Sequence, residues 1–201
     1  MKAPLAAVDF STALDTLSRD LCRRIPELAH IDPDRLLFSI ARSRAEGIHG
    51  TYARIAPLRF PGGVREHTRR RGPWRETFRM PVLQHRQREI YYLITVLIPR
   101  FLRLSFEQKL STIVHELYHI SEACDGDIRR FPGRNFAHGS SRGTYNRIIQ
   151  QLVDHYLAGD PPESILDFLH LDESSWSQRQ IRICGITTAV PRARLVTRSR
   201  S

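Results

Sequence analysis

The sequence predicts a single α+β domain over residues 1–201, and three observations lead to that prediction. Residues 10–25 have helical periodicity, and two further amphipathic segments follow in the second half of the chain. Between them lie three short runs rich in β-branched and aromatic residues, which are typical of strands. The hydrophobic fraction of 41% is that of a globular protein, and the chain is long enough for one domain with a substantial core.

The N-terminal third is predicted to form a helix followed by two strands. Apolar residues recur at helical intervals over residues 10–25, which predicts an amphipathic helix. Two β-rich runs follow, LLFSIARSRA at 36–45 and GTYARIAPLRF at 50–60, and glycine and proline bracket the second. We expect these two runs to pair as a hairpin.

The middle of the chain contains an Arg-rich stretch and a third strand. Residues 61–89 are rich in Gly, Pro and Arg without usable periodicity, so they are predicted to form a loop or an extended excursion. Residues 89–100, EIYYLITVLIPR, read as a buried strand that completes a three-stranded sheet. At the other end of the chain, the basic tail at about 190–201 is expected to be loose at its end.

Three further helices are predicted after the sheet. The first spans residues 106–123, and Ser105 with Gln108 forms a capping box at its start. The second spans 144–157 and has one broad apolar face. A short helix at 163–171 follows a Gly-Asp-Pro-Pro break.

The charge of the chain bears on its partners. The formal net charge is +10, and the basic residues are nearly all arginine, since Lys2 and Lys109 are the only lysines. Guanidinium groups pair well with phosphate or carboxylate, so nucleic acid or an acidic protein surface is one interpretation. A GC-rich genome, in which arginine replaces lysine, is the other. Net charge leaves both open, because it bears on non-specific binding and not on fold.

Cysteine content and hydropathy exclude several classes of protein. Cys22, Cys124 and Cys184 lie far apart and form no CxxC pair, which excludes a zinc ribbon and argues against a disulfide framework. The most apolar run, at 90–99, is about half as long as a membrane-spanning helix, and we see no signal-peptide pattern. We therefore expect a cytoplasmic protein with no membrane attachment.

The helix predicted over 106–123 contains the sequence VHELYHI, which has the HExxH pattern. On a helical projection, His119 falls about 40° and Glu116 about 100° from His115. The apolar side chains of the helix fall on the opposite face, about 140–220° away. They are Phe106, Leu110, Ile113, Leu117 and Ile120. The helix is therefore expected to bury one face and to turn both histidines to the other.

This arrangement predicts a hydrolytic zinc site. Two imidazoles one turn apart can both reach a Zn²⁺ ion about 2 Å from each nitrogen. Zinc lowers the pKa of a bound water to about 7, and Glu116 is placed beside the metal to deprotonate it. The expected metal ligands are His115 and His119, with Glu116 as the catalytic base.

A catalytic zinc usually has three protein ligands, and we considered three candidates for the third. Asp125 has metzincin spacing, but Glu122 occupies the place of the glycine that this pattern needs, and no Met-turn follows. Glu122 itself would have to reach the metal from the same rigid helix as the histidines. His138 follows a loop long enough to fold back, and Gly139 after it allows close backbone approach, so His138 is the predicted ligand. Tyr145, Arg134 and Arg142 remain unranked candidates for the donor to the oxyanion.

The sequence resembles a known family in several places. KLSTIVHELYHIS, followed by DGDIRRF and by HGSS before an apolar helix, is similar to the putative phage metallopeptidase family. More distantly it resembles SprT/Spartan-like zincins, in which a third histidine stands in an HG pair. The resemblance implies a small zincin-like domain with an N-terminal helix, a three-stranded sheet, an HExxH helix and a following ligand-bearing helix. It also implies His115, His119 and His138 as zinc ligands.

The sequence therefore predicts a zinc metallopeptidase that cleaves a protein or peptide by metal-activated water. In zincins an edge strand pairs with extended substrate, and each of the three predicted strands is a candidate. The alternative is a non-proteolytic, zinc-stabilised module that binds nucleic acid. It depends on RRRGPWR (69–75), where Trp74 among arginines could stack on a base, and on the basic tail. The oligomeric state is not predicted.

Overall fold

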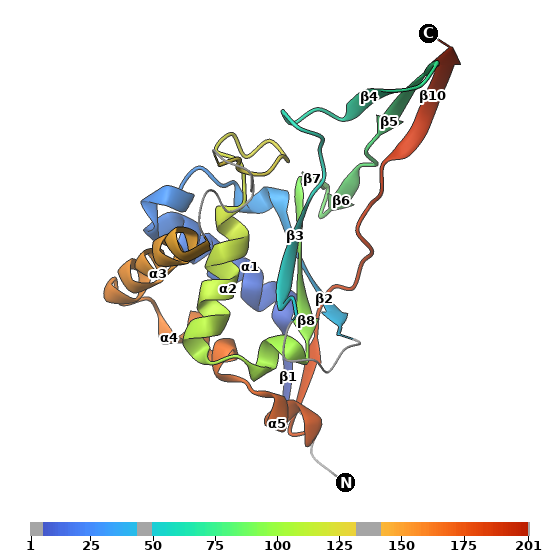
Figure 1. Cartoon of the computed structure of the whole chain (residues 1–201). Coiled ribbons are helices and arrows are strands. Elements are labelled where there is room, and N and C mark those ends of the chain that lie inside the picture. Colours follow the sequence, from blue (N-terminus) through green and yellow to red (C-terminus); the bar gives the residue numbers. More distant parts are fainter. Residues whose placement is uncertain (1–5, 44–49, 132–141, 201) are drawn as a thin grey trace.

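The computed structural model describes residues 6–43, 50–131 and 142–200, and it has a mixed α+β fold (Figure 1). Helices cover one side of a central sheet, and a second, Arg-rich sheet projects away from this body. Across these residues, every helix is too short or too polar to cross a bilayer.

The central sheet has three strands in the order β2-β8-β3. β2 (Leu36–Arg42) is parallel to β8 (Tyr92–Ile98), and β3 (Ala53–Pro57) is antiparallel to β8 on its other side. The predicted three-stranded sheet is confirmed, but the predicted hairpin between 36–45 and 50–60 is wrong. The two strands do not pair with each other, because β8 is inserted between them and is buried on both faces.

Three helices form the body with this sheet. α1 (Phe10–Arg24) packs against β2, α2 (Phe106–Tyr118) packs against β3, and α3 (Arg142–Ala158) packs against α2. The predicted capping box starts α2: the Gln108 N–H donates to Ser105 Oγ at 3.2 Å, and the Ser105 N–H donates to Gln108 Oε1 at 3.0 Å. The core between these elements is apolar and includes the fully buried residues Phe10, Leu14, Ile94, Val96, Leu110, Ile113 and Leu117. All three helices were predicted.

The predicted extension of α2 to Ala123 is wrong. His119 is the C-cap of the helix. Its carbonyl accepts a hydrogen bond from the Arg129 N–H at 2.7 Å, and Ile120 forms an antiparallel bridge with Ile128. These bonds with a segment further along the chain replace the next helical hydrogen bonds, so the helix stops at this point.

The Arg-rich stretch and the tail form one sheet. β4 (Glu66–Arg71), β5 (Trp74–Arg79) and β10 (Arg194–Arg200) pair antiparallel in the order β10-β5-β4. The predictions of a loop at 61–89 and of a loose tail at 190–201 are therefore wrong. Alternation of polar and apolar residues reveals a strand when one face is buried against a core, and every residue of β4 and β10 is exposed.

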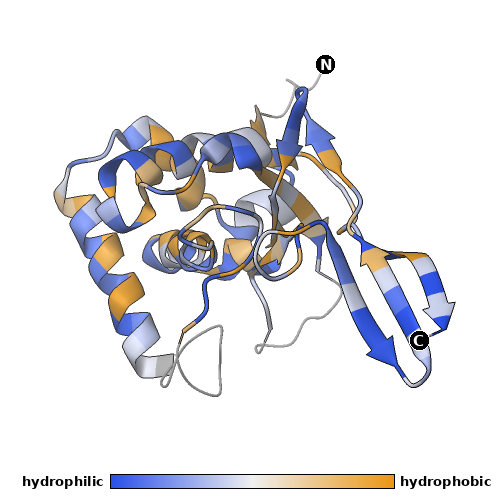
Figure 2. Ribbon diagram, turned by 90° about the horizontal axis from the view of Figure 1, so that it is seen from above, coloured by the Kyte–Doolittle hydropathy of each residue, from blue (hydrophilic) through white to orange (hydrophobic). Residues whose placement is uncertain are grey.

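The remaining elements are short. β1 (Ala6–Asp9) pairs parallel with β9 (Ile181–Cys184), and β6 (Leu83–His85) forms a hairpin with β7 (Arg88–Ile90). The predicted helix at 163–171 is confirmed as α4 (Glu163–Leu166) and a 3₁₀ turn (Asp167–His170), which α5 (Glu173–Ser177) follows. Figure 2 shows that the sheet ending at the C-terminus is mainly hydrophilic, whereas hydrophobic residues concentrate in the body.

Candidate active site

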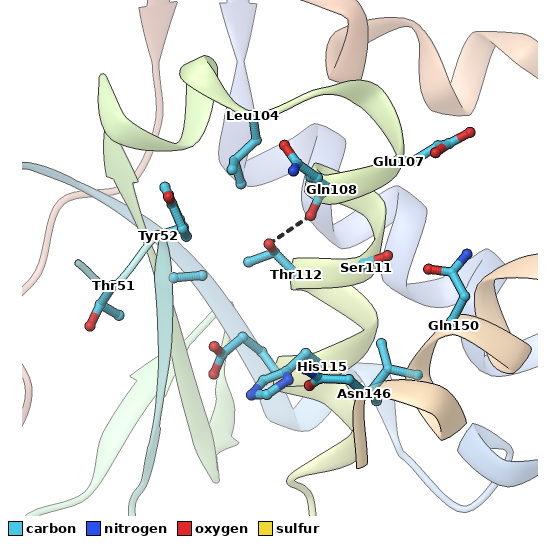
Figure 3. Close-up of a pocket in the computed structure, with 13 residues that line it drawn as sticks. Thr51, Tyr52, Leu104, Glu107, Gln108, Ser111, Thr112, His115, Asn146 and Gln150 are labelled. Atoms are coloured by element: carbon cyan, nitrogen blue, oxygen red, sulfur yellow. Dashed lines mark hydrogen bonds between the residues drawn. The ribbon is translucent and has the colours of Figure 1, made fainter. Parts of the chain in front are cut away.

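A cleft of about 580 Å³ lies between the start of β3, α2 and α3 (Figure 3). The side chains that α2 contributes recur along one stripe of the helix, because residues three and four apart share a face. They are Glu107, Gln108, Ser111, Thr112, His115 and Glu116. Tyr52 and Ala53 form the wall at the sheet, and Asn146, Ile149 and Gln150 form the wall at α3.

The imidazole of His115, which lines the cleft, meets that of His119 at the end of α2. The Nε2 atoms of His115 and His119 are 3.1 Å apart, with the ring planes at 81°. Two imidazoles that share a tetrahedral zinc have these nitrogens roughly 3.3 Å apart, given Zn–N distances of about 2.0–2.1 Å. The same separation also suits a hydrogen bond between two neutral imidazoles. The separation of the two Nε2 atoms is therefore compatible with a shared metal and with a direct hydrogen bond.

The ring of Tyr145 in α3 packs against both imidazoles. Its ring centroid lies 5.0 Å from that of His115 and 5.6 Å from that of His119, and its side chain is buried. The Tyr145 hydroxyl lies 3.5 Å from the backbone carbonyl oxygen of His115. α3 thus restricts the orientation of both imidazoles. Of the other oxyanion candidates, Arg134 and the side chain of Arg142 lie outside the described residues.

Glu116 lines the cleft next to the histidines and is only 8% exposed. Burial raises the pKa of its carboxyl to about 7, although a hydrogen bond with the backbone of Ile55 opposes this shift. The Tyr52 carbonyl accepts a hydrogen bond from the Leu97 N–H, and the Leu58 N–H donates to the carbonyl of Tyr91 just before β8. Backbone groups alternate in direction along a strand, so the N–H of the odd-numbered Ile55 faces away from β8. The free edge of β3 and α2 therefore meet at Glu116.

The structure tests two of the three candidates for a third metal ligand. Glu122 lies beyond the end of α2, and its side chain is 83% exposed. The Asp125 carboxylate accepts hydrogen bonds from Ser121 Oγ at 2.6 Å and from the Asp127 N–H at 3.1 Å, which engage it in a turn. Within residues 6–43, 50–131 and 142–200, no three His, Cys, Asp or Glu side chains are grouped to hold a metal. His138 lies outside the described residues, so its role stays a prediction.

Sequence reasoning missed two parts of the cleft. Asn146, Ile149 and Gln150 have helical spacing, but their sequence does not indicate which face of α3 lies beside α2. The second missed part is the backbone edge of β3, which depends on strand order and leaves no mark on residue types. The packing of Tyr145 on both imidazoles also follows from the way in which α3 docks.

A comparison with known families bears directly on this cleft. The model of the family described as putative phage metallopeptidase matches residues 10–157, which is most of the chain. The chain belongs to the putative phage metallopeptidase family. Membership implies a metal cofactor and a protein substrate, and the matched residues include every residue that lines the cleft. Searches of curated proteins and of solved structures gave no match. The distant likeness to SprT/Spartan-like zincins stays a prediction.

Proposed function

We propose that this protein is a zinc-dependent peptidase of the zincin type and that the cleft beside α2 is its active site. The observation that carries the proposal is the pair of imidazoles, with Nε2 atoms 3.1 Å apart, beside a buried carboxyl group on the same helix. Imidazole nitrogen suits zinc, and the separation agrees with two corners of a tetrahedral site. His138 is proposed as the third ligand.

The residues around such a metal would have separate roles in the reaction. When bound, zinc would polarise the scissile carbonyl and lower the pKa of the attacking water. Glu116 would first accept a proton from that water as a general base. It would then deliver the proton to the leaving amine as a general acid. Tyr145 would hold the imidazoles in place, because its ring packs on both.

The edge of β3 is proposed to bind the substrate backbone. β8 lies inside the sheet, and the outer edge of β2 already makes a hydrogen bond, which the Ile40 N–H donates to the Ile186 carbonyl at 2.8 Å. β3 has an outer edge, and Tyr52 and Ala53 at its start line the cleft. An extended peptide could pair with this edge and place one peptide bond near His115.

Replacing Glu116 by Gln tests the proposal. We expect E116Q to retain one zinc per chain and its melting temperature, and to lose peptide cleavage by about 10²–10⁴-fold, because only the proton acceptor is removed. E107Q is the matched control, since Glu107 lines the same cleft at the exposed start of α2. Zinc is measured by elemental analysis, and cleavage by mass spectrometry of a peptide mixture.

The same pair of variants separates the proposed function from its alternative. A wild-type protein that binds zinc and cleaves no peptide supports a zinc-stabilised binding module. Cleavage that persists in E116Q shows that Glu116 is not the base. Equal losses in E116Q and E107Q would assign the effect to the charge of the cleft instead.

A further inference from the structure

Two Arg-rich segments that are far apart in sequence meet in one sheet. β5 is the middle strand, and β4 and β10 pair with its two edges (Figure 1). Trp74 lies opposite Arg71 on one side and opposite Arg200 on the other, so the turn between β4 and β5 lies beside the end of β10. The two basic segments therefore form a single surface.

This sheet carries most of the excess charge of the protein. Its strands contain eight arginines and two glutamates, whereas the net charge of the whole chain is +10. Arg79 pairs with Glu66 at 2.6 Å, and Arg69 and Arg198 both pair with Glu76, at 3.2 and 3.6 Å. The other five arginines have no carboxylate partner within the described part of the chain. They are Arg70, Arg71, Arg75, Arg194 and Arg200.

The two outer strands of the sheet are open on both faces, whereas the middle strand buries Glu76. Every residue of β4 and of β10 is exposed, although successive residues of a strand point to opposite faces. Because Arg70 and Arg71 are adjacent in β4, one points to each face. A sheet of this kind buries little apolar area of its own. Its projection from the body is therefore not explained by packing (Figure 2).

Aromatic rings support some of these arginines. The Arg198 guanidinium lies 4.4 Å from the centroid of the Trp74 ring, and the Arg69 guanidinium lies 4.6 Å from that of Phe78. Such stacking limits the freedom of a side chain that would otherwise be mobile. Both guanidinium groups also pair with Glu76, so the arginines that remain for a phosphate are the five without a carboxylate partner among the described residues.

We infer that the sheet formed by β4, β5 and β10 binds nucleic acid through the phosphate backbone. Guanidinium groups bind phosphate oxygens in pairs, and nucleic acid presents phosphates at regular, close spacing. Protein interfaces are depleted of charge at their centre, whereas the exposed faces here are densely charged. The exposed outer strands, together with the tip of the sheet at the turn between β4 and β5, allow contact with phosphates on more than one side. The inference is independent of the peptidase activity.

The test compares two variants that remove equal charge from the full-length protein. R71Q/R75Q/R200Q removes three unpaired arginines at the tip of the sheet. R42Q/R147Q/R182Q removes three exposed arginines on β2, α3 and β9 that pair with no carboxylate among residues 6–43, 50–131 and 142–200. Binding of a short fluorescein-labelled DNA duplex of mixed sequence is measured by anisotropy from about 50 to 200 mM NaCl.

We expect wild-type protein to bind with an affinity that falls steeply with salt. The sheet variant should reduce the slope of log K against log salt by about 3, roughly one per lost phosphate contact, and the control variant should retain it. R71K/R75K/R200K keeps the charge and should keep most of the slope, which covers the case in which the glutamine variant fails to fold. Thermal unfolding followed by circular dichroism checks each protein.

Three outcomes would overturn the inference. The first is an equal loss in the control variant, since the binding would then reflect overall charge. The second is displacement of the duplex by polyglutamate as effectively as by unlabelled duplex, which would indicate an acidic protein partner. The third is no binding by the wild-type protein at about 50 mM salt.

Discussion

The cleft beside α2 and the sheet of β4, β5 and β10 place their polar groups in opposite environments. In the cleft, Glu116 is nearly buried, and its pKa is raised by that burial. In the sheet, arginines stand in solvent on both faces, held by strand pairing and by two aromatic rings. The first region is built by helices and strands that pack together, and the second by backbone hydrogen bonds between strands.

This difference shows where each region can be changed without loss of the fold. A side chain in the body contacts several elements, so its removal affects both packing and chemistry. A side chain of the sheet contacts mainly its cross-strand neighbours, so its removal should change binding and leave stability nearly unaltered. Matched substitutions in the two regions test this contrast.

The largest effect is expected at His138. H138A should lower zinc content and reduce peptide cleavage by at least about 100-fold, because a metal with one ligand fewer is held more weakly. It should also increase hydrogen exchange in α3, since a bound metal stabilises only the folded state. Zinc content, cleavage and exchange are measured on the same preparation.

Asp125 provides the control for that experiment. D125A should keep its zinc, because the Asp125 carboxylate is engaged by Ser121 and by the Asp127 N–H. The sheet variant R71Q/R75Q/R200Q should keep both zinc and cleavage. Zinc that is lost in D125A and kept in H138A would indicate a metzincin-like site and contradict the proposed ligand set.

The next effect is a contrast between two leucines. Leu117 is fully buried in α2 and Leu195 is 48% exposed in β10. L117A should lower the free energy of unfolding by about 2–5 kcal/mol through lost burial and a cavity. L195A should change it by less than about 0.5 kcal/mol. Urea denaturation measures both, and similar losses would show that the sheet is packed as the body is.

Removal of a buried ion pair should lower the free energy of unfolding less than removal of a core side chain does. The loss should also depend on pH. The Asp20 carboxylate is buried and accepts hydrogen bonds from the Tyr156 hydroxyl at 2.8 Å and from Arg24 Nε at 2.9 Å, with Arg23 as a third partner. Burial alone would raise the pKa of Asp20, but these bonds outweigh it and hold the pKa below its usual 3.8. D20N should lower the free energy of unfolding at neutral pH by about 1–3 kcal/mol.

The sign of the pH dependence follows from the direction of this pKa shift. Because the pKa is lower in the folded state, the unfolded state takes up protons first, so the contribution is complete above pH 3.8 and is lost as pH falls further. D20N should therefore unfold with a weaker dependence on pH below that value. E66Q is the matched change in the sheet, and its exposed pair with Arg79 should contribute less than about 1 kcal/mol. Equal losses in the two variants would contradict the contrast.

The smallest effect is expected when only the hydroxyl of Tyr145 is removed. Y145F keeps the ring that packs on both imidazoles and removes an oxygen that lies 3.5 Å from the His115 carbonyl. Cleavage should change by less than about tenfold, with zinc content unchanged. A loss of 10²–10³-fold at constant zinc content would assign the oxyanion donor to this hydroxyl instead.

Local patterns identified the elements of the body correctly. The spacing of Leu110, Ile113 and Leu117 and the capping box at Ser105 predicted α2, because helical hydrogen bonds and caps join residues three or four apart. The same projection placed His115 and His119 on one face, and in the structure their imidazoles meet. Whether His138 joins them depends on residues that the structure does not describe.

Predictions failed where a partner lies far along the chain. The end of α2 depends on a bridge between Ile120 and Ile128, and the order β2-β8-β3 depends on β8 entering between two earlier strands. The sheet of β4, β5 and β10 was missed for a related reason. Its outer strands β4 and β10 are exposed on both faces, so they carry no alternation of polar and apolar residues, and β10 lies more than a hundred residues from β5.

The sequence by itself determined the helices, the face on which the HExxH residues lie and the excess of arginine, because each depends on residue type and short spacing. The tertiary structure decided which strand edge borders the cleft, that Tyr145 packs on the histidines, and that two basic segments form one surface. Strand pairing and helix docking join residues whose separation along the chain leaves no periodic signal. Burial, which gives Glu116 its raised pKa, exists only once those elements have packed.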